Sequence, residues 1–205
     1  MEMFEYSLAF QQLVESDDSV QLLLEGSCVY EETFADWEEG RRFISSAFDR
    51  GGTVLDVGCG NGFLLRCLQE WVPHGLEPYG IDINDDQLHQ ARSLYPDQAH
   101  HFANCEAASF IADRCASTTA IFPHLFDFIF WNVWDNARFT MDEYRRILDG
   151  LYCRLEVGGR LILGFYDVRP NNLSRITDLQ MLGYRVAGMA EASPHGTMVA
   201  WLDLL

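Results

Sequence analysis

The sequence predicts an α/β fold: a doubly wound, mostly parallel sheet of seven strands, with helices on both faces and an antiparallel last strand. Apolar, strand-like runs alternate with helix-like runs between residues 53 and 166, which is typical of consecutive βαβ units. Three of these runs (54–57, 126–130 and 161–165) are almost continuously apolar, as expected for strands buried on both faces. The last stretch, 182–205, instead reads as two strands around Ser193-Pro194-His195-Gly196, and this turn predicts the antiparallel strand.

The elements are expected in the following order. Two short helices at 3–14 and 18–24 are followed by a longer helix over Thr33–Phe48, where apolar residues recur at helical spacing and Asp36 serves as a cap or first-turn acid. Strands are then expected at 53–58, 75–83, 100–105, 126–133 and 159–166, with helices at 62–71, 85–95 and 141–155 between them. Residues 111–125 are expected to form a long loop or an irregular helix.

The length of 205 residues predicts a single domain, 1–205, with 1–34 as an N-terminal helical lid over a core at 35–205. No apolar run reaches the roughly 18 residues that a membrane span needs. The N-terminal residues MEMFEYSLAF carry acids and no Lys or Arg, unlike a secretory signal. The six cysteines are scattered without a CxxC motif, which predicts buried free thiols in a reducing, cytoplasmic environment.

The charged residues exclude several classes of function. The chain has 31 acids against 14 bases, and every base is Arg. The absence of Lys rules out a lysine Schiff base and a GxxxxGK phosphate loop. A net charge of −17 disfavours binding of a nucleic-acid backbone. Residues 1–40 hold 11 of the acids and no Lys or Arg, which indicates either a solvated helix face or a docking surface for a cationic substrate or partner.

A glycine-rich loop follows the first strand of the alternating region. Gly58, Gly60 and Gly62 form a GxGxG pattern preceded by Asp56. The dinucleotide fingerprint GxGxxG would need glycine at 63, where Phe63 would obstruct the close approach of a pyrophosphate. An acid before the loop suits a ligand with a cationic amino group better than one with phosphates. Because ligands of open parallel sheets bind at the carboxyl ends of the strands, the loop predicts an adenosine ligand with an amino-acid tail.

Four blocks of sequence, in order, resemble the class I S-adenosylmethionine (SAM)-dependent methyltransferases, whose fold is Rossmann-like. DVGCGNG at 56–62 resembles their first motif, and YGIDINDDQLHQAR at 79–92 resembles their second strand and helix. FANCEAASF at 102–110 resembles the segment that borders the adenine. FDFIFWN at 126–132 and LEVGGRLILGFYD at 155–167 resemble the fourth and fifth strands. The chain departs from the family at Cys105-Glu106, where the adenine segment is ambiguous by a residue, and at 111–125, which is longer than usual.

The resemblance implies the residues that would hold SAM. Asp56 would face the amino group, directly or through water, and Gly58, Gly60 and Gly62 would give room for the tail. Asp82, which lies 22 residues after Gly60, would accept both ribose hydroxyls, because a carboxylate has two oxygens. Further cofactor contacts are assigned to Ile83, Asn104, Cys105, Trp131, Arg41 and Tyr30, of which Asn104 falls where the family often has Asp. For Asp56, Asp82 and Asn104, the alternatives are a turn residue, a helix-cap acid and a loop residue.

Arg41 is assigned to the SAM carboxylate because it falls on the apolar stripe of the helix expected at 33–48, between Phe34 and Trp37 on the helical wheel. A charged group on an apolar stripe must be paired or must reach a wet site. A structural salt bridge to one of the many acids nearby is the alternative.

The acceptor side is less informative, and no catalytic residue is identified. Trp131, Asn132, Tyr166 and His195 are the candidates, with Trp134 as a further wall of an aromatic pocket. The end of the fourth strand lacks the NPP[YF] signature of amino-group methylation on bases or glutamine. Only Asp135 and Asp167 could serve as ligands in a metal-dependent catechol-type site, and His100-His101 with Asp97 has loose ligand spacing, so no metal is expected.

The sequence therefore predicts a cytoplasmic, SAM-dependent methyltransferase that acts on a small molecule, as a monomer or homodimer, without a nucleic-acid or membrane partner. Two alternatives stay open. One is methylation of a basic protein, which the charge of −17 also favours. The other is a SAM-binding interaction module without methyl transfer, because fold does not fix function.

Overall fold

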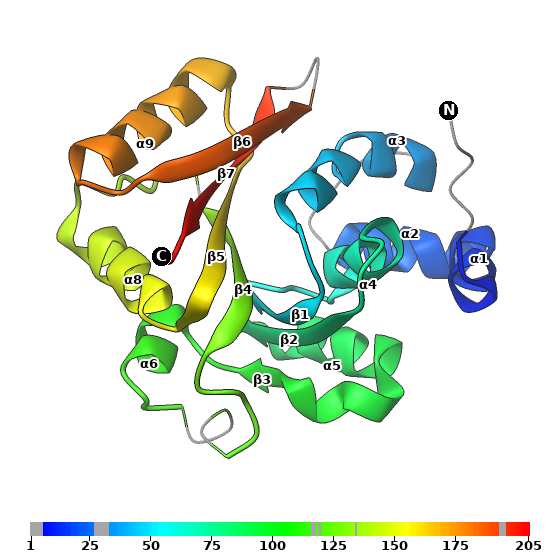
Figure 1. The fold of residues 1–205 in the computed structure, drawn as a ribbon. Helices are drawn as coiled ribbons and strands as arrows, with labels where there is room; N and C mark the ends of the chain where they lie inside the picture. The colour runs from blue at the N-terminus through cyan, green and yellow to red at the C-terminus, as the bar shows by residue number, and fades with distance from the viewer. Residues whose placement is uncertain (1–5, 27–32, 116–117, 119, 134, 193–195) are drawn as a thin grey trace.

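The computed structural model describes residues 6–26, 33–115, 118, 120–133, 135–192 and 196–205. Its centre is a seven-stranded sheet with the order β3-β2-β1-β4-β5-β7-β6 (Figure 1). The strands are β1 (Gly52–Val57), β2 (Leu76–Asp82), β3 (Phe102–Asn104), β4 (Phe126–Val133), β5 (Leu155–Phe165), β6 (Val186–Ala192) and β7 (Thr197–Asp203). The first five strands run parallel, and β7 pairs antiparallel with both β5 and β6. The predicted fold class is confirmed.

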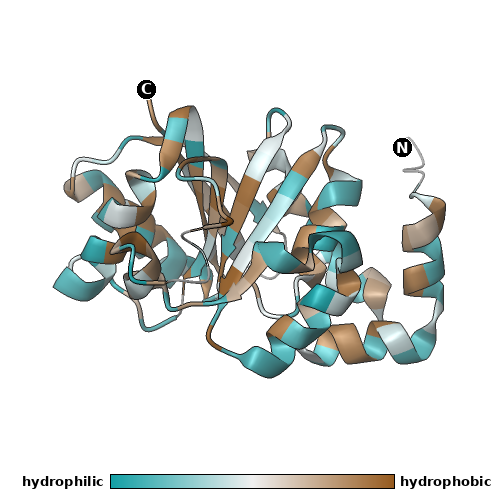
Figure 2. Ribbon diagram, turned by 90° about the horizontal axis from the view of Figure 1, so that it is seen from below, coloured by the Kyte–Doolittle hydropathy of each residue, from teal (hydrophilic) through white to brown (hydrophobic). Residues whose placement is uncertain are grey.

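Helices cover both faces of the sheet. One face carries α1 (Leu8–Glu15), α2 (Asp17–Gly26), α3 (Phe34–Glu39), α4 (Phe63–Trp71) and α5 (Asp85–Leu94), with the 3₁₀ helix η1 (Arg42–Ala47). A second 3₁₀ helix, η2 (Pro96–His101), precedes β3, and its His101 stacks on Tyr79 of β2. The other face carries α6 (Ala107–Ile111), α8 (Asp142–Tyr152) and α9 (Arg169–Met181). The helix ribbons alternate between teal and brown stretches in Figure 2, as expected for amphipathic helices with one face against the sheet.

The prediction of one helix over Thr33–Phe48 is wrong, because this segment forms two short helices, α3 and η1. Thr33 caps α3 through its hydroxyl, which accepts from the Asp36 N–H, and Asp36 lies in the first turn. Gly40 ends α3, and Arg41 leaves the helical region at φ −128°, ψ −28°. In η1 the hydroxyls of Ser45 and Ser46 bond the carbonyls three residues earlier, which favours a tighter turn than the α-helix. The helical wheel that placed Arg41 therefore does not apply.

The N-terminal helices dock on the first turn of α4. Phe63 is fully buried, and its ring lies 4.9 Å from that of Trp37 and 5.9 Å from that of Phe34. Phe10 of α1 joins this cluster at 5.7 Å from Phe34. Near the C-terminal end of α4, the Glu70 carboxylate accepts from both the N–H and the hydroxyl of Ser7. The residue that excluded a dinucleotide fingerprint is thus the anchor for α1 and α3.

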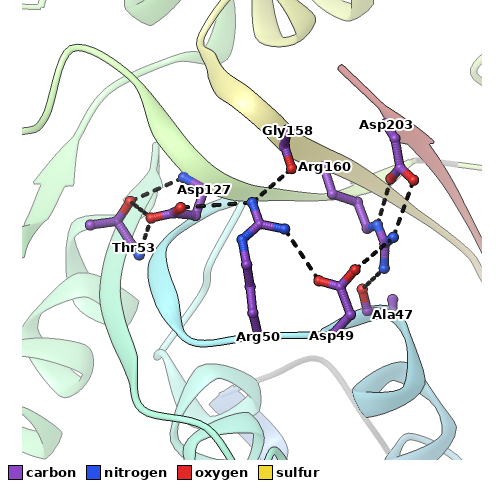
Figure 3. Close-up of polar contacts among 8 residues, drawn as sticks. All are labelled: Ala47, Asp49, Arg50, Thr53, Asp127, Gly158, Arg160 and Asp203. Atoms are coloured by element: carbon purple, nitrogen blue, oxygen red, sulfur yellow. Dashed lines mark hydrogen bonds and ion pairs between the residues drawn. The ribbon is translucent and has the colours of Figure 1, made fainter. Parts of the chain in front are cut away.

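A network of charged residues fastens the opposite end of the sheet, at the amino ends of β1 and β4 (Figure 3). Arg160 is 9% exposed, donates to both carboxylate oxygens of Asp203 at 2.6 and 3.2 Å, and lies 3.1 Å from Asp49. It also donates to the Ala47 carbonyl at 2.7 Å, which ties the end of η1 to β5 and β7. Arg50 spans Asp49, Asp127 and the Gly158 carbonyl. This end of the sheet is a structural clamp, distant from the carboxyl ends of the strands.

Four of the five cysteines in the described ranges are buried, as expected: Cys59, Cys67, Cys105 and Cys115. Cys153 is exposed, because it caps the end of α8 at the surface. The expectation for Cys28 lies outside the described residues. Burial raises the thiol pKa of Cys59, Cys67 and Cys105, which makes these groups unreactive. Within the described ranges, no helix is both long enough and apolar enough to cross a bilayer.

Candidate functional site

The chain order reverses between β1 and β4. From β1 the chain crosses to β2 and β3 on one side, then returns to β4 on the other side of β1. Loops at the carboxyl ends of β1 and β4 therefore diverge, and the crevice between them is the place where open α/β sheets bind ligands. The glycine loop follows β1 at this point, and Asp82 ends the neighbouring β2.

The three glycines of the loop differ in role. Gly58 has φ 81° and is exposed, and a Cβ there would meet nothing within 4 Å, so a ligand can approach its backbone. Gly62 has φ 73° and is buried, and a Cβ there would lie 3.3 Å from Ala91 and Tyr95. Gly62 therefore allows the close packing of α4 against α5. A Cβ on Gly60 would lie 2.7 Å from Oε1 of Gln87.

Asp82 is the residue that organises the loop. Its Oδ2 accepts from the Gly60 N–H at 2.8 Å, and its Oδ1 accepts from the Asn84 N–H at 2.8 Å. Because each carboxylate oxygen offers about two lone pairs, both can still accept a hydroxyl. Asn84 in turn caps α5 by accepting from the Asp86 and Gln87 N–H groups. The carboxylate is thus held at the end of β2 by the loop beside it.

Asp56 is a buried carboxyl group with an unsatisfied oxygen. It is 3% exposed, and its Oδ1 has no hydrogen-bond partner within the part of the chain that the structure describes. Burial, together with the charge of nearby Asp82, raises the pKa of Asp56 from 3.8 to about 8. An orphaned buried oxygen of this kind is costly unless a partner arrives, and a cationic amino group is a fitting partner.

The segment expected to border an adenine lies at the end of β3. Asn104 pairs in register with Asp82 and donates through Nδ2 to the Ile83 carbonyl at 3.3 Å. Ile83 is 73% exposed, so its side chain lies open at the surface. Cys105 is buried and donates its N–H to the Asp82 carbonyl at 2.9 Å. Ile83 and Asn104 thus flank Asp82 at one rim of the crevice.

The other rim is formed by the ends of β4 and β5. Asn132 is exposed and pairs in register with Gly164, two residues before Tyr166. The Arg41 guanidinium lies 4.8 Å from the Tyr166 ring and 5.8 Å from the Trp37 ring, so it bridges α3 and the end of β5. Trp131 points to the opposite face, where it is 4% exposed and packs on Phe139. The candidates Tyr30, His195 and Trp134 lie outside the described residues.

A buried arginine, which the sequence analysis missed, holds this rim together. Arg175 of α9 is fully buried and donates to the carbonyls of Asp135 and Ala137 after β4. It also donates to Asp167 Oδ2 at 3.1 Å and to Asn172 Oδ1 at 2.9 Å. Asn172 extends the network, donating to the carbonyls of Asp167 and Gly196 at 2.7 and 2.9 Å. One network therefore connects the segments after β4 and β5 with the start of β7.

The carboxylate of Asp167 is committed to this network. It accepts from Asn171, the Val168 N–H and Arg175, and these bonds lower its pKa. Asp135 contributes its carbonyl, whose bond to Arg175 fixes the segment after β4. Across the described ranges, no group of three or more His, Cys, Asp or Glu side chains is placed to hold a metal ion. His101 is buried, with Nδ1 against the Pro78 carbonyl at 3.0 Å.

A family profile described as "Methyltransferase domain" matches residues 54–159, just over half of the 205 residues. The chain belongs to the methyltransferase domain family. The match contains the glycine loop, Asp82, Asn104 and β4, the elements that form the crevice. The resemblance to class I SAM-dependent methyltransferases is confirmed for family and fold. Members of this class use SAM, and the orphaned oxygen of Asp56 with the open backbone at Gly58 fits the amino end of that molecule.

Solved structures share the fold of this methyltransferase domain. A chain of the complex between the Haloferax volcanii Trm112 methyltransferase activator and a methyltransferase has a TM-score of 0.61 at 13% identity, covering 83% of this chain and 91% of that one. A TehB-like SAM-dependent methyltransferase from Corynebacterium glutamicum has a TM-score of 0.56 at 16% identity, covering 95% of this chain and 100% of that one. The ribosomal protein L11 methylase of Lactobacillus delbrueckii has a TM-score of 0.54 at 16% identity, covering 84% of this chain and 79% of that one. No curated protein matches the sequence. These likenesses show the fold and leave the acceptor undetermined.

Proposed function

We propose that this methyltransferase domain binds SAM at the carboxyl ends of β1 and β2 and transfers its methyl group to a small-molecule acceptor. The observation that carries the proposal is the orphaned Asp56 oxygen beside the open face of Gly58. SAM supplies an activated methyl on a sulfonium, so the protein has to position the acceptor and handle its proton. Asp56 would face the amino group and Asp82 the ribose hydroxyls, with Ile83 and Asn104 beside the adenine. Asn132 and Tyr166, at the ends of β4 and β5, would lie beside the acceptor, and the catalytic base is unassigned.

Incubation with methyl-labelled SAM tests this function. Transfer to members of a panel of small O-, N- and S-acceptors, without transfer to cationic peptides, is the expected result. Methylation of the peptides instead would favour the protein-directed alternative, which the net charge of −17 also supports. Binding of SAM without turnover on either panel would favour a non-catalytic module.

The affinity for the cofactor is expected to rise with pH as Asp56 ionises. With a pKa of about 8, Asp56 is mostly protonated at pH 7, and a carboxylate pairs with an ammonium group better than a neutral acid does. Binding of S-adenosylhomocysteine, which keeps the amino group, should release a proton near pH 7. Calorimetry in two buffers of different ionisation enthalpy measures this release, and Asp56→Asn should abolish it.

The same raised pKa has a consequence for the unliganded protein. A carboxyl whose folded-state pKa lies above its ordinary 3.8 favours the folded state at low pH and loses this contribution as pH rises from about 4 to about 8. Asp56→Asn should therefore flatten the pH dependence of unfolding in that window. Proton release and stability profiles identical to those of the wild type would contradict the assignment.

Arg41 is proposed to grip the SAM carboxylate. Its guanidinium lies over Tyr166 at the end of β5 and can form two parallel bonds to a carboxylate. Arg41→Met should lose affinity for SAM but bind an analogue without the carboxylate about as well as the wild type does, in paired titrations. Equal losses for both ligands would assign Arg41 a structural role, and no loss for either would leave it a surface pair.

Methyl transfer, once an acceptor is found, is expected to survive EDTA. The carboxylate oxygens of Asp167 already accept from Asn171, Val168 and Arg175, and a Mg²⁺ site needs several free oxygen ligands. Turnover measured with and without EDTA shows whether methyl transfer depends on a metal ion. Loss of turnover on chelation, restored by Mg²⁺, would return Asp135 and Asp167 to the catalytic role.

A further inference from the structure

The middle residue of the glycine loop contacts the N-terminal helices. Asn61 lies between Gly60 and Gly62, is 1% exposed, and points away from the crevice. Its Nδ2 donates to the Leu23 carbonyl in α2 at 2.7 Å and to Oε1 of Gln90 in α5 at 3.3 Å. Its Oδ1 accepts from the Phe63 N–H, the first residue of α4, at 3.2 Å. One side chain thus joins the loop to three helices.

Gly26, the last residue of α2, packs closely against the side chains of Asn61 and Gln90. A Cβ on Gly26 would lie 2.5 Å from the Gln90 Oε1 and 2.6 Å from the Asn61 Nδ2. The Gly26 carbonyl would lie 3.9 Å from a Cβ on Gly60, so the end of α2 lies directly over the loop. A side chain at 26 would therefore displace the Asn61 and Gln90 amides from their present positions or move α2 away from them.

The loop is held from the cofactor side as well. The Gly60 N–H is bonded to Asp82, and the N–H groups of Gly58 and Cys59 both donate to the Ile81 carbonyl. The same short segment, 58–62, therefore carries the proposed cofactor contacts on one side and the contact with α2 on the other. A ligand that orders this segment must also favour the docked position of α2.

We propose that Asn61 is a positioning residue that couples docking of α1 and α2 to the conformation of the glycine loop, so that cofactor binding and N-terminal docking strengthen each other. The inference rests on the proposed cofactor site. It assigns residues 8–26 a contribution to cofactor affinity that acts through Asn61 and needs no contact of these helices with the ligand. By reciprocity of linkage, a given gain in one equilibrium must appear in the other.

Asn61→Asp tests the coupling with an isosteric change. The new side chain can still accept from the Phe63 N–H, but it presents an acceptor to two acceptors, the Leu23 carbonyl and the Gln90 oxygen. Its affinity for S-adenosylhomocysteine should fall about fivefold or more. In the wild type, the ligand should slow amide hydrogen exchange across 8–26, and in Asn61→Asp this protection should be largely lost. Gly26→Ala, which crowds the Asn61 and Gln90 amides from the α2 side without altering the sequence of the loop, should act in the same direction.

Gln69→Glu is the matched control, because Gln69 on α4 makes the same kind of bond at 3.0 Å, but to the Leu76 carbonyl at the start of β2. It should leave the affinity and the protection of 8–26 within about twofold of the wild type. Exchange across 8–26 that the ligand leaves unchanged in the wild type, or unchanged affinity in both Asn61→Asp and Gly26→Ala, overturns the coupling. Failure of the wild type to bind S-adenosylhomocysteine at all would instead refute the cofactor site, and the coupling with it.

Discussion

Asp82→Ala is expected to weaken SAM binding by more than tenfold. The variant would remove the two hydrogen bonds that we propose the ribose hydroxyls donate to the Asp82 carboxylate, each worth about 1.5–3 kcal/mol. It also frees the N–H groups of Gly60 and Asn84, each of which donates to the Asp82 carboxylate at 2.8 Å. The loss of affinity therefore has a direct part and a part that comes from a less ordered glycine loop. Calorimetric titration of wild type and variant measures their sum.

Asp85→Ala is the control for this prediction. Asp85 is exposed, lies three residues further along in the first turn of α5, and carries the same charge. Its removal should change the affinity for SAM less than twofold, because an exposed charge in a first turn contributes only a few tenths of a kcal/mol to its helix. Unchanged affinity in a folded Asp82→Ala protein would mean that the ribose is held elsewhere and that the assignment of the motif is wrong.

Arg175→Met is expected to lower the free energy of unfolding by about 2–5 kcal/mol, because it leaves at least two buried acceptors, Asn172 Oδ1 and the Ala137 carbonyl, without their donor, at about 1–3 kcal/mol each. Arg175 is fully buried, and its removal orphans Asn172 Oδ1 and the carbonyls of Asp135 and Ala137, besides one Asp167 oxygen. Urea unfolding monitored by circular dichroism measures the change. The free energy of unfolding of Arg175→Lys should lie between those of the wild type and Arg175→Met, because lysine keeps the charge but has fewer donors.

The matched control is Arg145→Met on α8. Arg145 is 51% exposed and pairs with Asp149 one turn later at 3.9 Å, so its loss should cost less than about 1 kcal/mol. A loss for Arg175→Met as small as that for Arg145→Met would contradict the view that Arg175 fastens the segments after β4 and β5.

The parts of the fold that were predicted correctly depend on local patterns of apolar residues. The alternation of strands and helices from β1 to β5 follows from runs that are apolar throughout or apolar on one face, and these runs are buried as expected. The glycine loop was located because only glycine suits a chain at φ 81° and 73°.

The helix α9 was missed for a physical reason. Its buried face consists of Asn172, Arg175, Ile176 and Leu179, so half of its core positions are polar and the apolar periodicity is weak. Only Pro170, near its first turn, marks a helix start. The hydrogen-bond network of Arg175 on this helix could not be predicted either, because the sequence does not distinguish a buried arginine from an exposed one until its four partners are placed.

The helix over 33–48 was overestimated because periodicity ignores backbone breaks. Gly40 and the hydroxyls of Ser45 and Ser46 were sufficient signals for a break. The role of Asn61 could not be derived from the motif, because its partners lie in α2 and α5, 38 and 29 residues away.

A crystal structure of the protein with S-adenosylhomocysteine tests the central claim most directly. The account predicts the ribose hydroxyls within hydrogen-bond distance of the Asp82 carboxylate, the amino group at the orphaned oxygen of Asp56, and the thioether sulfur turned toward Asn132 and Tyr166. A ligand bound elsewhere, or one whose ribose does not contact Asp82, would contradict the account.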